Sequence, residues 1–308
     1  MISCRLISNA YRMEAQLLRT FVTVARLSSF SAAARELGYT QAAVSQQIAA
    51  LETDLKAQLL TRRPVTPTEP GARLLEHAGP ILLRLDAARA DVTRMTRTPP
   101  NAALVVGVTP LAGAASALPA ALAALRARMP RLEITVETAP RQELATATAS
   151  GELDLALTDG LTAPGDPLPE QAPVTAIGLT EEPVSVVLPP GHPLAARPAL
   201  RLPDLADARW IEADNAAPPL KEIRRHAAAE GFRAALRYPG LDITTLINLA
   251  AEGHGLTLLP ETVLNDRGIT AVRVTQPRVT HRIELIHAAL PKHSTAATLA
   301  GILARHQR

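Results

Sequence analysis

Cysteine, aromatic residues and long apolar runs are all scarce in this sequence. The only cysteine, Cys4, excludes an internal disulfide, a cysteine-rich zinc site and any switch that needs two thiols. Aromatic residues make up 2% of the 308 residues, so stacking platforms for single-stranded nucleic acid are not expected. No apolar run approaches the roughly 18–20 residues that span a bilayer, and the polar opening is unlike a secretory signal. We therefore expect a cytoplasmic protein.

The motifs of common enzyme and metal sites are missing too. The sequence has no G-x-S-x-G, no P-loop and no Rossmann glycine fingerprint. His192 and His254 lie near predicted strand ends, in "PPGHPLA" and "AEGHG", but neither has Cys, His or carboxylates at the spacing of a metal site. We expect no enzymatic activity, no cofactor and no bound metal.

The rest of the composition is that of a globular protein with two or three domains. Apolar residues make up 47% of the chain, and the net charge of +3 permits nucleic-acid binding without demanding it. Helical patterns occupy residues 14–97, whereas strand and helix patterns alternate over 102–308, which favours a parallel α/β sheet. We predict a disordered leader over 1–13, with Met13 as an alternative start, a helical domain over 14–71, a linker helix over 72–98 and an α/β domain over 102–308.

The segment "SSFSAAARELGYTQAAVSQQIAALE" predicts two short helices joined by a tight turn. Ser29 and Thr40 are suited to cap the two helices, and Gly38 suits the left-handed end of the first. One face of the second helix is apolar and the other is small and amide-rich: Val44, Ile48, Leu51 and Leu55 against Gln41, Ala42, Ser45, Gln46 and Ala49. Glutamine presents a donor–acceptor pair to adenine, and small residues let a helix enter the major groove. The pattern indicates a helix-turn-helix, with a merely solvent-exposed polar face as the alternative.

A short turn follows in "LLTRRPVTPTEPG". Arg62 and Arg63 stand beside Pro64, which predicts a wing whose cations contact phosphates or a minor groove. An arginine pair on an ordinary solvated surface is the alternative.

A long helix is predicted from Thr68, which can cap it. Apolar residues recur along it at alternating spacings of four and three, the pattern of a two-helix seam: Leu74, Ala78, Ile81, Leu85, Ala88, Val92 and Met95. Pro80 lacks the N–H that would bond to the carbonyl of Glu76, so we expect a bend there. We predict a dimerisation helix, with a core helix of a single chain as the alternative.

Residues 14–75 resemble the winged helix-turn-helix of LysR-type transcriptional regulators. The resemblance lies in "LRTFVTVARLSSFSAAARELGYTQAAVSQQIAALE", in "LLTRR" and in "TEPG". Four positions depart from the family pattern, which has proline at 42, glycine at 56, phenylalanine at 60 and leucine at 67. The resemblance implies a regulator that binds double-stranded DNA at a near-palindromic operator as a homodimer or tetramer. The expected DNA-contacting residues are Ser31, Thr40, Gln41, Ala42, Ser45, Gln46, Arg62 and Arg63.

The family resemblance also implies an effector-binding domain of two lobes, similar to periplasmic binding proteins. We place lobe I at about 102–175 and 279–308 and lobe II at about 176–278, with a small-molecule effector between them. Open α/β sheets bind ligands beyond the carboxyl ends of their strands, and a free helix N-terminus suits a carboxylate. The residues expected there are Thr109, Pro110, Leu111, Thr158, Asp159, Asp214, Asn215 and Thr244. Asp214 and Asn215 are also suited to cap the helix predicted at Pro218.

Two other classes of protein remain open on the sequence. One is a cytoplasmic α/β enzyme or solute-binding protein with an unrelated helical appendage. The other is an architectural DNA-binding protein without a ligand. Salt-dependent binding to specific DNA discriminates against the first, and stabilisation by a small molecule discriminates against the second.

Overall fold

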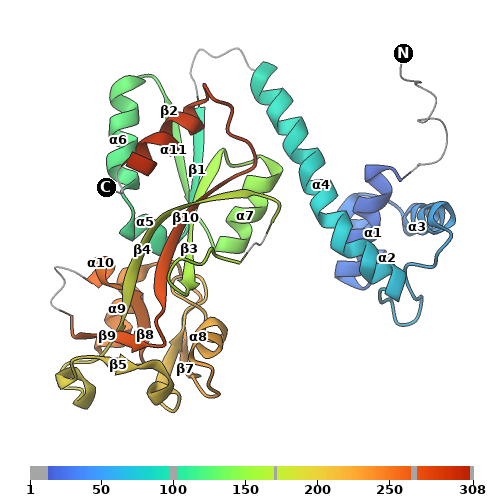
Figure 1. The fold of residues 1–308 in the computed structure, drawn as a ribbon. Coiled ribbons are helices and arrows are strands. Elements are labelled where there is room, and N and C mark those ends of the chain that lie inside the picture. Colours follow the sequence, from blue (N-terminus) through green and yellow to red (C-terminus); the bar gives the residue numbers. More distant parts are fainter. Residues whose placement is uncertain (1–12, 97–102, 170–171, 265–268, 306–308) are drawn as a thin grey trace. The chain divides into compact units, whose positions relative to one another are not determined.

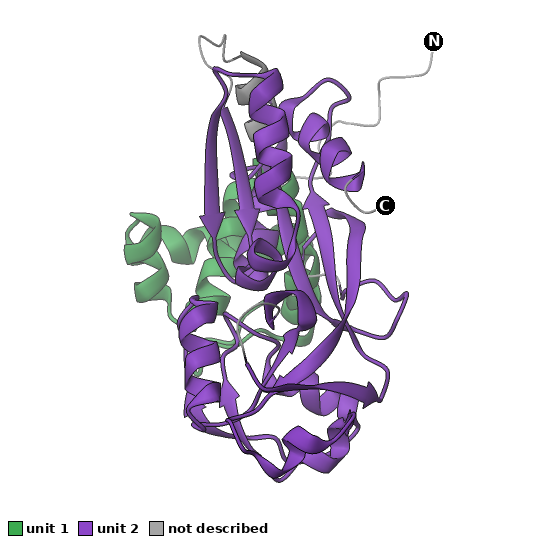
Figure 2. Ribbon diagram, turned by 90° about the vertical axis from the view of Figure 1, so that its left-hand side faces the viewer, with its two compact units in different colours: residues 1–86 green, residues 87–308 purple. Residues whose placement is uncertain are grey.

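The computed structural model describes residues 13–96, 103–169, 172–264 and 269–305. The predicted leader lies almost wholly outside these residues. The chain divides into two compact units, residues 1–86 and residues 87–308, which are coloured green and purple in Figure 2. No helix among the described residues is long and apolar enough to cross a membrane.

The first unit consists of short helices around a small apolar core. Its helices are α1 (Ala15–Leu27), α2 (Phe30–Leu37), α3 (Gln41–Leu55) and the first part of α4 (Glu69–Thr96). Phe21 and Val24 of α1 pack with Val44 and Ile48 of α3 in this core. The predicted caps are confirmed, since the side chains of Ser29 and Thr40 accept the N–H groups of Ala32 and Ala43, and Gly38 is left-handed with φ 70°.

The C-terminal end of α3 differs from the family pattern in a way that the backbone explains. Lys56 ends the helix in the left-handed conformation, with φ 52°, at the position where the family has glycine. Leu55 lies at this end and is 38% exposed, so the prediction that it belongs to the buried face of α3 was wrong.

Replacing Lys56 with glycine is expected to stabilise the first unit by about 1 kcal/mol, because glycine adopts the left-handed region without a clash at Cβ. Hydrogen exchange of the α3 amides in the full-length protein, followed by mass spectrometry, measures the change. Faster exchange in the variant than in the wild type would contradict the expectation.

Helix α4 begins where the sequence predicts, with Thr68 accepting the N–H of Gly71 at 3.2 Å. It continues through Pro80 as a single helix. Its first turns pack on α1, where Ala78 and Leu82 enclose Leu18.

The first part of the second unit is a sheet covered by helices. Strands β1 (Ala103–Val108), β2 (Glu133–Thr138) and β3 (Leu155–Thr162) run parallel, and β10 (Thr280–His287) lies antiparallel beside β3. The helices of this part are α5 (Pro110–Ala115), α6 (Leu118–Arg128), α7 (Arg141–Ser150) and α11 (Thr295–Arg305). Helices α6 and α11 lie side by side over β1 (Figure 1), and their apolar residues share a core with Leu155 and Ile283.

The second part has its own core around Trp210 and Phe232, whose ring centroids are 5.4 Å apart. Its sheet joins the end of β4 (Thr175–Val187) to β8 (Thr257–Pro260) and β9 (Ala271–Gln276), with β5 (Leu200–Arg201) at the edge. A separate parallel pair is formed by β6 (Arg209–Glu212) and β7 (Arg233–Arg237). The helices are η1 (Pro193–Ala196), η2 (Leu202–Leu205), α8 (Leu220–Ala227), α9 (Ile243–Ala251) and α10 (Glu261–Leu264).

Two long antiparallel strands, β4 and β10, run between the two parts (Figure 1). The sheet order is β2-β1-β3-β10-β4-β9-β5, and the sheet is mixed: the predicted parallel arrangement holds for β1, β2 and β3, whereas β10 and β4 are antiparallel to their neighbours. Register along the pair shifts between Ile283 and Glu284, where Leu179 of β4 has no partner. Gly178 lies beside this shift. A Cβ at this position would lie 2.2 Å from Nη2 of Arg282, so the guanidinium occupies the space that a larger residue would need.

Candidate functional site

The outer face of α3 is small, polar and exposed, as a groove-binding helix requires. Gln41, Ala42 and Gln46 are exposed and Ser45 is half-buried, whereas Val44 on the opposite face is fully buried. Exposed Thr40 precedes the helix. The hydroxyl of Ser31, from α2, donates to Oε1 of Gln41 at 3.1 Å and so fixes that side chain.

The predicted wing is a short antiparallel turn. The N–H of Thr61 donates to the carbonyl of Thr66 at 2.9 Å, and Leu60 pairs with Pro67. Glu52 of α3 anchors its start by accepting the N–H groups of Leu59 and Leu60.

The two wing arginines differ in their surroundings. Nη2 of Arg62 lies 3.4 Å from Oε2 of Glu52, and its guanidinium lies 4.9 Å from the ring centre of Phe30. Arg63 is exposed. Arg62 is therefore held in one place with part of its charge compensated, while Arg63 extends into solvent.

The predicted seam residues of α4 divide into two groups. Leu74 and Ala78 pack within the chain, and fully buried Ala78 has no surface left for a partner helix. Ile81, Leu85, Ala88 and Val92 are exposed, with Val92 at 62%. The side chain of Met95 lies outside the described residues. The exposed group keeps the alternation of four and three, while Leu82 and Asp86 between its members still contact Leu18 and Arg19 of α1.

Six of the eight residues predicted to bind an effector line one cavity of about 270 Å³ in the second unit: Thr109, Pro110, Leu111, Asp159, Asp214 and Asn215. Five of them follow the carboxyl ends of β1 and β6, and Asp159 lies within β3, in the region where ligands bind in open α/β sheets. The starts of α7 and α8 contribute Arg141, Gln142, Lys221 and Glu222 to the lining. Asn215 donates to the carbonyl of Pro239 at 2.8 Å, and α8 has Pro219 at its cap, so the Asp214–Asn215 pair does not cap that helix.

The other two predicted residues are not among those that line the cavity. Thr158 is buried and lies opposite Glu284 on β10; it precedes Asp159 in an extended strand, so its side chain points to the other face of the sheet. Thr244 lies at the start of α9, where the carboxylate of Asp242 already accepts the N–H groups of Thr244 and Thr245. That helix end is therefore occupied by the chain's own anion.

Thr109 and Asp159 of the cavity lining belong to an ionic network that the sequence did not suggest. His281 of β10 is fully buried, and its Nε2 lies 2.9 Å from Oδ2 of Asp159. Oδ1 of Asp159 accepts the hydroxyl of Thr109. On the other side, Nδ1 of His281 lies 3.7 Å from Oε1 of Glu182 in β4. This ionic network thus joins β3, β10, β4 and the residue after β1 behind the cavity.

The charged groups of this ionic network stabilise one another in their ionised forms. Burial alone would lower the pKa of His281, but the bond to Asp159 and the charges of Asp159 and Glu182 outweigh it and raise the pKa to about 9. Burial would raise the pKa of Asp159, yet His281, Thr109 and the N–H of Ala112 hold it below its ordinary value. At neutral pH the ionic network behind the cavity therefore contains an imidazolium between two carboxylates.

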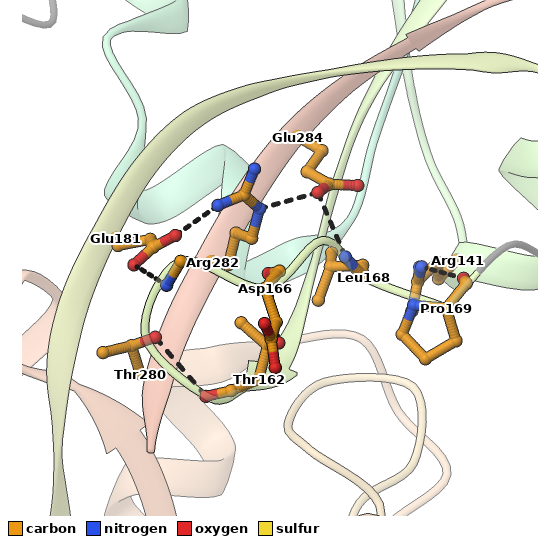
Figure 3. Close-up of polar contacts among 10 residues, drawn as sticks. Arg141, Thr162, Asp166, Leu168, Pro169, Glu181, Thr280, Arg282 and Glu284 are labelled. Atoms are coloured by element: carbon orange, nitrogen blue, oxygen red, sulfur yellow. Dashed lines mark hydrogen bonds and ion pairs between the residues drawn. The ribbon is translucent and has the colours of Figure 1, made fainter. Parts of the chain in front are cut away.

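Arg141 is held at the edge of the cavity by the loop that follows β3. Its Nη2 donates to the carbonyl of Pro169 at 2.6 Å, and burial lowers its pKa. Figure 3 shows how the same loop is tied to β10: buried Glu284 accepts the N–H of Leu168 at 3.1 Å and Nε of Arg282 at 2.6 Å. Arg282 also donates to Glu181. These contacts hold the loop on β10, and the loop in turn holds Arg141 through the carbonyl of Pro169.

Models of two protein families match the chain. Residues 15–72 match "Bacterial regulatory helix-turn-helix protein, lysR family", and residues 97–307 match "LysR substrate binding domain". A similar curated protein is the "Probable hydrogen peroxide-inducible genes activator" of Mycobacterium avium, 31% identical over 93% of this chain and 92% of that protein. Another is the "Small neutral protease regulatory protein" of Streptomyces coelicolor, 30% identical over 85% of this chain and 77% of that protein.

Solved structures share the fold. A Corynebacterium glutamicum OxyR C206 mutant is 28% identical with a TM-score of 0.53, covering 96% of this chain and 92% of that one. Full-length BenM is 23% identical with a TM-score of 0.54, covering 96% of each chain. The matches cover the helix-turn-helix, the long helix α4 and the α/β unit. The chain belongs to the LysR family and is a DNA-binding transcriptional regulator, not an enzyme.

Proposed function

We propose that this regulator binds a near-palindromic DNA site as a dimer and responds to a small molecule held in the cavity between the ends of β1, β3 and β6. The observation that carries the proposal is that cavity, about 270 Å³ in volume and lined by charged and hydrogen-bonding groups. A ligand that contacts both parts of the second unit stabilises one arrangement of them over others and so alters the DNA-bound state. Action on chromosomal DNA fits the cytoplasmic location expected from the sequence.

The signal is not thiol oxidation in the effector-binding unit. Several relatives are named as hydrogen peroxide-inducible activators, but the only cysteine here is Cys4, outside the matched residues 97–307. Peroxide chemistry at a thiol needs a cysteine thiolate at the sensing site. A bound metabolite is therefore the better candidate for the signal.

Replacing Gln46 with alanine is expected to weaken binding to the cognate operator by about 1–3 kcal/mol, because the amide loses its donor–acceptor pair with a base. Electrophoretic mobility shift or fluorescence anisotropy on the promoter region of the regulator's own gene measures the loss. Arg63→Ala is the matched control: a phosphate contact should weaken all sequences alike and shallow the salt slope by about one unit. Equal loss on random DNA for Gln46→Ala would contradict base reading.

Replacing Leu85 with glutamate is expected to lower dimer affinity about 100-fold or more, because a charge in an apolar seam costs several kcal/mol. Light scattering after size exclusion measures the mass of the wild type, the variant and the off-seam control Arg84→Gln. A variant that keeps the wild-type mass at micromolar concentration would remove the exposed stretch of α4 from the dimer contact.

A further inference from the structure

Charges of both signs surround the effector cavity, and among the described residues no ion pair within 4.0 Å joins them, although the charge of Glu222 acts on Arg141. Arg141 and Lys221 contribute cations, while Asp214 and Glu222 contribute carboxylates. Within the described part of the chain, none of Lys221, Asp214 and Glu222 forms an ion pair, and Arg141 donates to a backbone carbonyl. Because polar recognition depends on complementary charge, such a cavity favours a ligand that carries both a cation and an anion.

The hydroxyl of Thr109, in the cavity lining, can take only one role in a hydrogen bond to a ligand. The hydroxyl of Thr109 has a single hydrogen, and it is donated to Asp159. Asp159 also accepts from Nε2 of His281 and from the N–H of Ala112, so this carboxylate is satisfied within the chain. The oxygen of Thr109 is left with its lone pairs, and it can only accept. A ligand group that reaches this oxygen, which also lies 3.5 Å from the carbonyl of Leu157, must therefore present an N–H or O–H.

We infer that the effector is a small zwitterion of the amino-acid type, with its ammonium donating to Thr109 and its carboxylate facing Arg141 and Lys221. The inference rests on the proposed effector pocket and adds the chemistry of its ligand. The cavity volume of about 270 Å³ lies at the lower end for small-molecule sites, which limits the ligand to metabolite size. A plain carboxylate lacks the donor that Thr109 requires, and a plain amine lacks the anion.

The test is thermal shift and calorimetry on the full-length protein with the twenty proteinogenic amino acids. Each amino acid that binds is compared with two compounds of the same skeleton, the des-amino carboxylic acid and the decarboxylated amine; for leucine these are 4-methylpentanoate and 3-methylbutylamine. We expect at least one amino acid to raise the melting temperature, and both matched compounds to bind at least tenfold more weakly. This comparison needs no variant.

Thr109→Val removes the acceptor with little change of shape and should weaken the amino acid at least tenfold while leaving its des-amino partner unchanged. Thr158→Val is the matched control, since that buried threonine lies on the other face of the same sheet, and it should bind as the wild type does. Emission from Trp210, the only tryptophan, verifies that each variant retains the core of the second unit.

Two results overturn the inference. One is equal affinity for the amino acid and its des-amino partner, which would keep the proposed pocket but assign it to plain carboxylates. The other is no response to any of the twenty amino acids. Failure of the proposed function is detected by a separate measurement: the same protein preparation would show no specific binding to operator DNA.

Discussion

Replacing His281 with leucine is expected to lower the free energy of unfolding of the second unit by about 3–5 kcal/mol, the range for removing one partner of a buried ion pair. The substitution leaves the carboxylates of Asp159 and Glu182 facing an apolar side chain where they now face an imidazolium. The side chain of Asp159 is largely buried and Glu182 is half-buried, so the charge of Asp159 must be relieved by protonation or partial unfolding. Denaturation by urea, followed by the emission of Trp210, reports this unit alone because no other tryptophan exists.

His287→Leu is the matched control for this experiment. His287 lies on the same strand and the same face, six residues further along, and its Nδ1 is buried without a hydrogen-bond partner among the described residues. Removing such a nitrogen is expected to be neutral or stabilising. Comparable losses for the two variants would mean that packing, and not the ion pair, stabilises this strand.

The pH dependence follows from the raised pKa of His281, about 9 in the folded chain against an ordinary 6.5. Folding favours the protonated ring, so its contribution is complete below pH 6.5 and is lost as pH rises through 9, by up to about 3 kcal/mol. The lowered pKa of Asp159 works at the other end, since its contribution is lost only in acid, below its ordinary 3.8. The difference in stability between wild type and His281→Leu should therefore shrink between pH 6.5 and 9. A constant difference would show that His281 is neutral when folded.

Local signals in the sequence predicted the helix-turn-helix well. Caps such as Ser29 and Thr40 act on N–H groups two or three residues away, so the sequence alone contains both partners. Strand β1 is visible in the sequence for the same reason, since residues 103–108 form a continuous apolar run bounded by a turn. Six of the eight residues predicted to bind an effector line the cavity, because the ends of strands are visible in such patterns.

The features that the sequence did not predict depend on residues that are distant from one another along the chain. Strand β10 pairs with β3 and β4, more than 90 residues away, and only the alternation in "THRIELIH" could have suggested it. His281 was missed with it, because its partner Asp159 is 122 residues distant. Thr158 shows a second limit: an error of one position in a strand moves a side chain to the other face of the sheet.

Replacing Gly71 with alanine is expected to destabilise the first unit by about 3 kcal/mol or more, as overpacking against a fixed group does. A Cβ at this position would lie 2.0 Å from the carbonyl oxygen of Leu59, where real Cβ atoms are essentially never found. The clash is with backbone, and this carbonyl already accepts the N–H of Thr68 at 2.9 Å, so neither side can move without loss of the bond that joins the wing to α4.

The substitution should also weaken DNA binding, since the wing and the start of α4 share this contact. Hydrogen exchange in residues 58–72 of the full-length protein measures the local loss, and operator affinity measures its consequence. Ala72→Ser is the control, because that exposed helical residue is expected to tolerate the change within about 0.5 kcal/mol. If these amides exchange as slowly in the Gly71→Ala variant as in the wild type, the first turn of α4 must be able to move away from Leu59. The close approach of the two backbones would then not be required for the fold of this unit.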